Sequence, residues 1–108
     1  MAIIDMNVET FNKYVVEGDK PVLVDFWGPE CVYCRRIEGI FEKVAAQYEN
    51  DIIVGKVNVD DEVILAIKEN VEVVPTLKFY KGGKAVGSVV APQSRSAIDN
   101  FVKENLEK

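Results

Sequence analysis

Short apolar runs alternate with amphipathic segments along the chain, and each segment has the length of one strand or one helix. Apolar and β-branched runs predict strands near residue 3 and over residues 21–27, 52–59, 76–80 and 85–90. Apolar residues at helical spacing predict helices over residues 8–16, 31–48, 62–69 and 94–106. No linker, low-complexity stretch or internal repeat interrupts this order. The pattern therefore indicates a single α/β domain over residues 1–108.

The order of the segments predicts how the strands pair. Strands and helices alternate in the first half, which is typical of parallel strands joined by helical crossovers. In the second half, two strands flank Lys81-Gly82-Gly83-Lys84, and paired glycines suit the positive φ angles of a tight hairpin turn. These last two strands are therefore expected to be antiparallel. We predict a central mixed sheet of about five strands flanked by about four helices.

Composition and charge narrow the range of partners. The 108 residues are 48% hydrophobic, which is enough for one core, and we expect a monomer. Thirteen Lys and Arg against 18 Asp and Glu give a net charge of −5, which argues against binding to nucleic acid or anionic lipid. Residues 1–5 resemble no leader peptide, and no run approaches the ~20 apolar residues of a membrane span. We therefore expect a cytoplasmic protein whose partners are proteins or small thiols.

Cys31 and Cys34 are the two cysteines of the chain, and they lie where a strand-like run gives way to a helical pattern. At a spacing of three, both sulfurs face the same side of a helix's first turn and can close a disulfide. In a reducing compartment such a pair is more typical of catalysis than of a structural crosslink. The alternative is a pair of zinc or iron-sulfur ligands. Without histidine or further cysteine, a closed metal site would need two chains, so we predict a redox pair and no bound metal or cofactor.

Local sequence context predicts a chemical role for Cys31 and for Asp25. Cys31 would lie at the amino end of its helix, where free N–H groups and the helix dipole lower a thiol pKa below about 8.5, and this predicts the nucleophile. Asp25 is the one charged residue in the run 22–27. A buried carboxylate there would have a raised pKa and could transfer a proton. The alternative for Asp25 is a side chain that points into solvent at the strand end.

The order and spacing of four sequence elements resemble the thioredoxin family over essentially the whole chain. They are Val24-Asp25-Phe26-Trp27, the Cys-x-x-Cys that follows it, Val74-Pro75-Thr76 and the Gly82-Gly83 hairpin. A Cys-x-x-Cys alone is a weak signal, but its combination with the upstream Asp and the downstream Val-Pro-Thr is specific. The resemblance implies the thioredoxin fold.

The resemblance also implies roles around the cysteine pair. Cys34 would be the more buried, resolving thiol, Asp25 would take its proton, and Lys56 would lie close to Asp25. For Lys56 the alternative is an ordinary solvated lysine on a strand. By the same resemblance Trp27 would shield the disulfide.

A substrate groove is implied next to the cysteines. The Val74–Pro75 peptide bond would be cis, and the Val74 backbone would be free to bind an extended segment of the target. The alternative is an ordinary trans proline that enters an edge strand. Ala91 stands where the family commonly has glycine, so its methyl group is expected to narrow the approach of the target backbone.

Several departures from the family pattern cluster around the site. Glu30 replaces the usual Trp before the nucleophile, and its charge is expected to oppose thiolate formation. Val32 and Tyr33 replace the usual Gly-Pro, which is expected to change the relative stability of dithiol and disulfide. Gly39 stands where many members have proline and is expected to weaken or bend the long helix.

These features predict a protein disulfide reductase that works through a Cys31–Cys34 dithiol-disulfide couple. Its partners would be disulfide-containing target proteins and, because the chain has no nicotinamide or flavin fingerprint, a separate thioredoxin reductase or an equivalent electron donor. One alternative is a thioredoxin-fold oxidant, isomerase or dedicated donor to one partner. The other is a non-catalytic binding module on the same scaffold.

Overall fold

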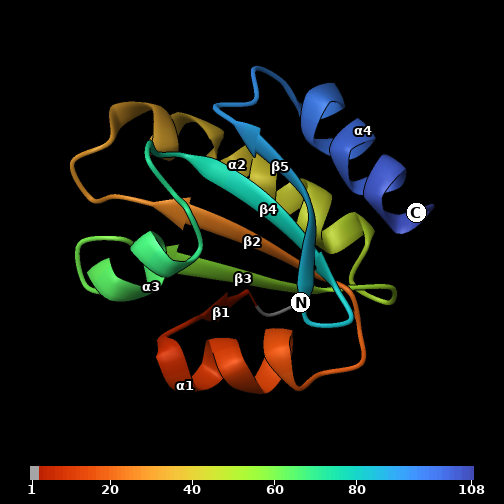
Figure 1. Ribbon diagram of the computed structural model, residues 1–108. Coiled ribbons are helices and arrows are strands. Elements are labelled where there is room, and N and C mark those ends of the chain that lie inside the picture. Colours follow the sequence, from red (N-terminus) through yellow and green to blue (C-terminus); the bar gives the residue numbers. More distant parts are fainter. Residues whose placement is uncertain (1–2) are drawn as a thin grey trace.

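The computed structural model describes residues 3–108 and confirms the predicted α/β fold with a mixed sheet (Figure 1). The elements in chain order are β1 (Ile4–Asp5), α1 (Val8–Phe11), the π-helical turn η1 (Asn12–Val16), β2 (Val22–Trp27), α2 (Val32–Gln47), β3 (Ile53–Asn58), α3 (Val63–Lys68), β4 (Thr76–Lys81), β5 (Lys84–Val90) and α4 (Arg95–Leu106).

The five strands lie in the order β1-β3-β2-β4-β5. β1, β3 and β2 run parallel and β4 and β5 are antiparallel, as the segment order predicted. β4 is also antiparallel to β2, a pairing that the sequence pattern did not specify. Gly82 and Gly83 have φ angles of 61° and 81° and form the turn between β4 and β5. The positive angles explain the glycines, because other residues adopt them at a cost. Because β2 is third in the order of the five strands, it is the central strand of the sheet. Its carboxyl end leads directly into the cysteine loop.

Side chains of β2 alternate between two separate cores, one on each face of the sheet. Leu23 packs with residues of α2 and α4, whereas Val22, Val24 and Phe26 pack with residues of α1, η1 and α3. Figure 1 shows α1 on the opposite side of the sheet from α2 and α4. Because Asp25 follows Leu23 by two residues, its side chain lies on the face that α2 covers. The alternation thus places a carboxyl group beneath α2, the helix that follows Cys31.

Three details of the helices add to the predicted pattern. The helix over 8–16 widens in its second half, where the N–H of Glu17 donates to the carbonyl of Asn12 at 2.9 Å. α2 continues through Gly39, and no side chain or distant backbone would meet a Cβ there within 4 Å. In α4 the buried position near the carboxyl end belongs to Asn105, which packs against Gly87 because that glycine has no side chain.

Within residues 3–108, no helix is both long enough and apolar enough to cross a bilayer.

Candidate active site

A disulfide joins Cys31 and Cys34 at the amino end of α2. The two Cα atoms are 5.3 Å apart. Cys31 is the N-cap residue of the helix, and its Sγ accepts a hydrogen bond from the N–H of Cys34 at 3.0 Å. Cys31 is partly exposed, whereas Cys34 is buried at 4% exposure. The first turn of α2 therefore presents one sulfur to solvent and encloses the other.

The segment before β4 lies against the exposed sulfur. The Val74–Pro75 peptide bond is cis, and Sγ of Cys31 lies 3.8 Å from the carbonyl oxygen of Val74. The N–H of Ala91 donates to the carbonyl of Pro75 at 2.9 Å, which joins this segment to the end of β5. Ala91 itself has a φ of 46°, a left-handed conformation that favours glycine. A segment 43 residues away in the sequence thus lies beside Cys31.

The two residues between the cysteines have different environments. Val32 is 62% exposed beside the disulfide. Tyr33 is half-buried, and its hydroxyl donates to the carbonyl of Pro92 at 2.8 Å. That bond ties the first turn of α2 to the loop after β5, and sequence analysis did not foresee it. Glu30 is exposed in the loop that precedes Cys31.

Asp25 is buried beneath α2 at 2% exposure, and its Oδ1 has no hydrogen-bond partner among residues 3–108. Burial raises the pKa of Asp25 from 3.8 to about 7 because the charged carboxylate is poorly solvated. The ammonium of Lys56 acts in the opposite direction, and the carboxylate of Glu38 adds to the increase. The solvent-facing alternative for Asp25 is therefore wrong for this structure. A carboxyl group with this pKa can both release and accept a proton near neutral pH.

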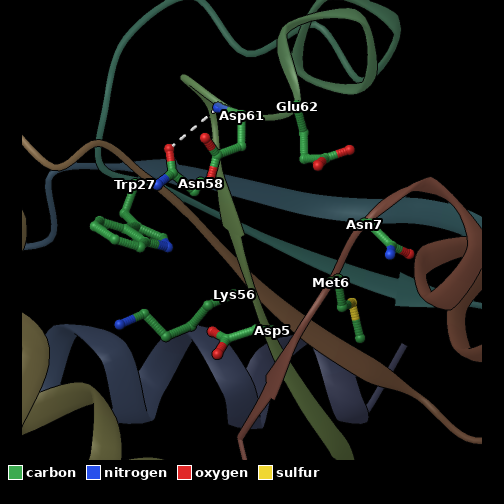
Figure 2. A pocket seen from close by; sticks show the side chains of 8 residues that line it. All are labelled: Asp5, Met6, Asn7, Trp27, Lys56, Asn58, Asp61 and Glu62. Carbon is green, nitrogen blue, oxygen red and sulfur yellow. Dashed lines mark hydrogen bonds between the residues drawn. The ribbon is translucent and has the colours of Figure 1, made fainter.

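Lys56 pairs with Asp25 in the register of β2 and β3, but its ammonium contacts other groups. Its Nζ lies 3.2 Å from Oε1 of Glu38 and 4.7 Å from the ring centroid of Trp27. Figure 2 shows the Lys56 side chain extending beneath the Trp27 ring. The side chain of Lys56 is 16% exposed, so the lysine is not simply solvated.

Sequence analysis missed Glu38. The available signal was its position four residues after Cys34, because residues at that spacing share one face of a helix. That face turns toward β2 and β3.

Two hollows flank this group of side chains. A small cavity of about 60 Å³ is lined by Asp25, Trp27, Cys34, Arg35, Glu38 and Lys56. It has room for water, which needs a polar lining and only a few tens of Å³. A larger hollow of about 350 Å³ shares Trp27 and Lys56 with the small cavity and is otherwise lined by β1, β3 and the residues that follow them (Figure 2). The small cavity is the one that joins Asp25 to the buried cysteine.

The donor atoms around the site do not form a metal centre. Among residues 3–108, no group of three or more potential metal-ligating Cys, Asp or Glu side chains gathers in one place. The chain contains no histidine. The two cysteines are instead joined to each other as a disulfide.

A Cys-x-x-Cys disulfide at the amino end of a helix, with a buried carboxyl group of raised pKa beneath it, is typical of a thiol-disulfide oxidoreductase. Comparison with known proteins agrees with this class. The thioredoxin family matches residues 2–104. Thioredoxin 1 of Nostoc sp. is 37% identical over 97 residues, which span 90% of this chain and 91% of the relative. Thioredoxin of Porphyra purpurea is 33% identical over 98% of this chain and 99% of its own length.

A chloroplastic M-type thioredoxin of Spinacia oleracea is 30% identical over 94% of this chain and 56% of its own length. The chain belongs to the thioredoxin family. Its fold is the thioredoxin fold, and its Cys31–Cys34 pair makes it a thiol-disulfide reductase. The prediction from sequence is confirmed at this level, and neither the oxidant nor the binding-module alternative is favoured.

Proposed function

We propose that Cys31 and Cys34 carry out the two successive exchanges of disulfide reduction. The Cys31 thiolate attacks one sulfur of the target disulfide, forms a mixed disulfide and releases the first target thiolate. Cys34 then loses its proton and attacks Sγ of Cys31, which releases the second target thiolate. Two electrons pass from the cysteine pair to the target, and the Cys31–Cys34 disulfide remains. A separate thioredoxin reductase or equivalent donor must then restore the dithiol.

The observation that carries these assignments is the contrast between the two sulfurs. Cys31 is the accessible one, and its Sγ accepts the N–H of Cys34 at 3.0 Å, which stabilises a thiolate at the helix amino end. Cys34 is buried, so it does not attack the target directly and acts only on Sγ of Cys31 once that sulfur is joined to the target. The order of attack follows from this difference in access.

Asp25 is the proposed acceptor of the Cys34 proton. Both residues line the small cavity, and a water there would connect the carboxyl group with the thiol. With a pKa of about 7, Asp25 is sufficiently basic to take a proton and sufficiently acidic to return it in the next cycle. Lys56 is the proposed modulator of this group because its positive charge lowers the pKa of Asp25.

The proposed target groove borders Cys31 and is formed by Trp27, Val74, Pro75 and Ala91. Among residues 3–108, no group accepts a hydrogen bond from the Val74 N–H, so this backbone is available to an extended target segment. The exposed side chains of Val32 (62%) and Val73 (52%) provide apolar contact beside the sulfur. Glu30 and the Val32-Tyr33 dipeptide are the proposed determinants of redox poise and target choice. We further propose that the protein is a cytoplasmic monomer that acts on disulfide-containing proteins.

Trapping of the intermediate tests the roles of the two cysteines. In the Cys34→Ser variant the first attack is intact, so mixed disulfides between Cys31 and a disulfide substrate such as insulin should accumulate in non-reducing gels. The Cys31→Ser variant is the matched control and should form none. Retention of insulin reduction by Cys31→Ser would overturn the assignment.

The reduction potential tests the direction of electron flow. For a general reductant we expect a reduction potential close to that of thioredoxin, which is about −270 mV. The potential is measured in defined dithiol-disulfide buffers. A value of about −180 to −120 mV would instead identify an isomerase or an oxidant.

A further inference from the structure

We propose that Glu38 is a positioning residue that holds the Lys56 ammonium at the mouth of the small cavity and thereby controls proton transfer at Asp25. This inference rests on the role of Asp25 proposed above. It adds a third charged residue to the site, which the resemblance to the family did not supply.

Two cationic and two acidic side chains line the same small space. Glu38, Lys56 and Asp25 all line the cavity of about 60 Å³. Lys56 is ion-paired with Glu38 at 3.2 Å and lies 4.7 Å from the Trp27 ring centroid. Lys56 is the register partner of Asp25, but Oδ1 of Asp25 has no hydrogen-bond partner among residues 3–108. The ammonium is therefore committed to Glu38 and Trp27 rather than to Asp25.

The surroundings of Asp25 contain few other charges. β3 contributes Lys56, and α2 contributes Glu38, Arg35 and the buried sulfur of Cys34. β4 contributes the apolar Leu77 opposite Asp25, and β1 carries Asp5 in register with Lys56. Of these groups, Lys56 and Glu38 are the two whose charges affect the pKa of Asp25, in opposite directions.

Removal of the Glu38 charge should lower the pKa of Asp25 in two ways. The direct repulsion between the carboxylates disappears, and Lys56 loses its ion-pair partner. Two carboxyl groups in register with Lys56 remain: Asp5, which is exposed and solvated by water, and Asp25, which is buried with Oδ1 unpartnered. Because the buried carboxylate lacks solvation, it should attract the released ammonium more strongly than Asp5 does. Asp25 would then be ionised at lower pH but would be a weaker base, so the resolving step would proceed with a weaker proton acceptor.

Charge neutralisation at Glu38 tests the proposal directly. We expect Glu38→Gln to move the titration of Asp25 to lower pH by about half a pH unit. The titration is followed in the oxidised protein by carboxyl NMR, which requires neither target nor turnover. Glu42→Gln is the matched control, because Glu42 is exposed on the same helix and contacts no charged partner among residues 3–108. Because the Glu38 side chain is 48% exposed, the shift should shrink in 1 M salt.

A double-mutant cycle separates positioning from direct repulsion. If Glu38 acts through the lysine, Glu38→Gln should shift the Asp25 titration less in a Lys56→Met background than in the natural sequence. Equal shifts in both backgrounds, or no shift relative to Glu42→Gln, would overturn the proposal.

The pH profile of the resolving step links the shift in the Asp25 titration to function. It is measured as the rate at which the target is released from the mixed disulfide at each pH. It should move to lower pH together with the titration of Asp25. If Asp25 titrates as expected but the pH profile does not follow, the proton-transfer role of Asp25 fails while the positioning by Glu38 stands.

Discussion

The backbone N–H of Cys34 lies 3.0 Å from Sγ of Cys31, so the first turn of α2 directs a hydrogen-bond donor at the sulfur that we propose as the nucleophile. In the reduced protein this donor and the helix dipole stabilise the Cys31 thiolate. Cys34 is buried and has no comparable access. The two thiols of one short motif are therefore chemically different.

Selective alkylation of the reduced protein measures this difference. Brief treatment with iodoacetamide at pH 7 should label Cys31 several-fold faster than Cys34, as mass spectrometry of the peptides would show. In the Glu30→Gln variant, the alkylation rate of Cys31 should reach its plateau at lower pH, because one negative charge before the thiolate is gone. Faster labelling of Cys34 would contradict the assignment.

Asp25 makes the stability of the protein depend on pH. The pKa of Asp25 is about 7 in the folded state, whereas the ordinary value is 3.8. At a pH between these two values, Asp25 is protonated in the folded state but ionised in the unfolded state. Stability is therefore lost as pH rises from about 4 to about 7, by up to about 4 kcal/mol.

The Asp25→Asn variant lacks this titration. Its free energy of unfolding relative to the natural protein should be lowest at pH 4 and should rise toward pH 8, as urea denaturation at each pH would show. Asp19→Asn, which removes an exposed charge, is the control. A difference that stays constant with pH would show that Asp25 does not titrate as described.

Tyr33 provides a test of the contact between the cysteine motif and the loop after β5. Loss of the hydroxyl in Tyr33→Phe removes the 2.8 Å hydrogen bond to Pro92 and should lower the free energy of unfolding by about 1 kcal/mol. Tyr14→Phe is the control, since the Tyr14 hydroxyl forms no hydrogen bond among residues 3–108. Equal effects of the two substitutions, measured by urea denaturation, would exclude a special role of the Tyr33 bond.

Ala91 has a backbone conformation that costs an alanine energy. With a φ of 46°, Ala91→Gly should relieve a steric cost of about 1 kcal/mol, partly offset by the greater freedom of glycine in the unfolded chain. We therefore expect a small increase in thermal stability. Ala85→Gly, in the extended strand β5, should instead lower it. Destabilisation of equal size at both positions would show that Ala91 is not strained.

Local pattern sufficed for most of the architecture. The apolar runs of β2 and β4, the Gly82-Gly83 turn and the spacing of Cys31 and Cys34 each depend on residues close together in the chain. Burial of Asp25 was also one of the two alternatives that the apolar run 22–27 predicted. These features follow from backbone geometry and from the burial of apolar side chains, which neighbouring residues largely determine.

Tertiary structure alone decided the contacts that give the site its particular character. The Lys56–Glu38 ion pair spans 18 residues and the Tyr33–Pro92 hydrogen bond spans 59. Each depends on strand register and on how α2 sits over the sheet, which no local spacing specifies. Charge and burial act through distance in space, so the basicity of Asp25 is a property of the packed helix and sheet together and not of the segment that contains it.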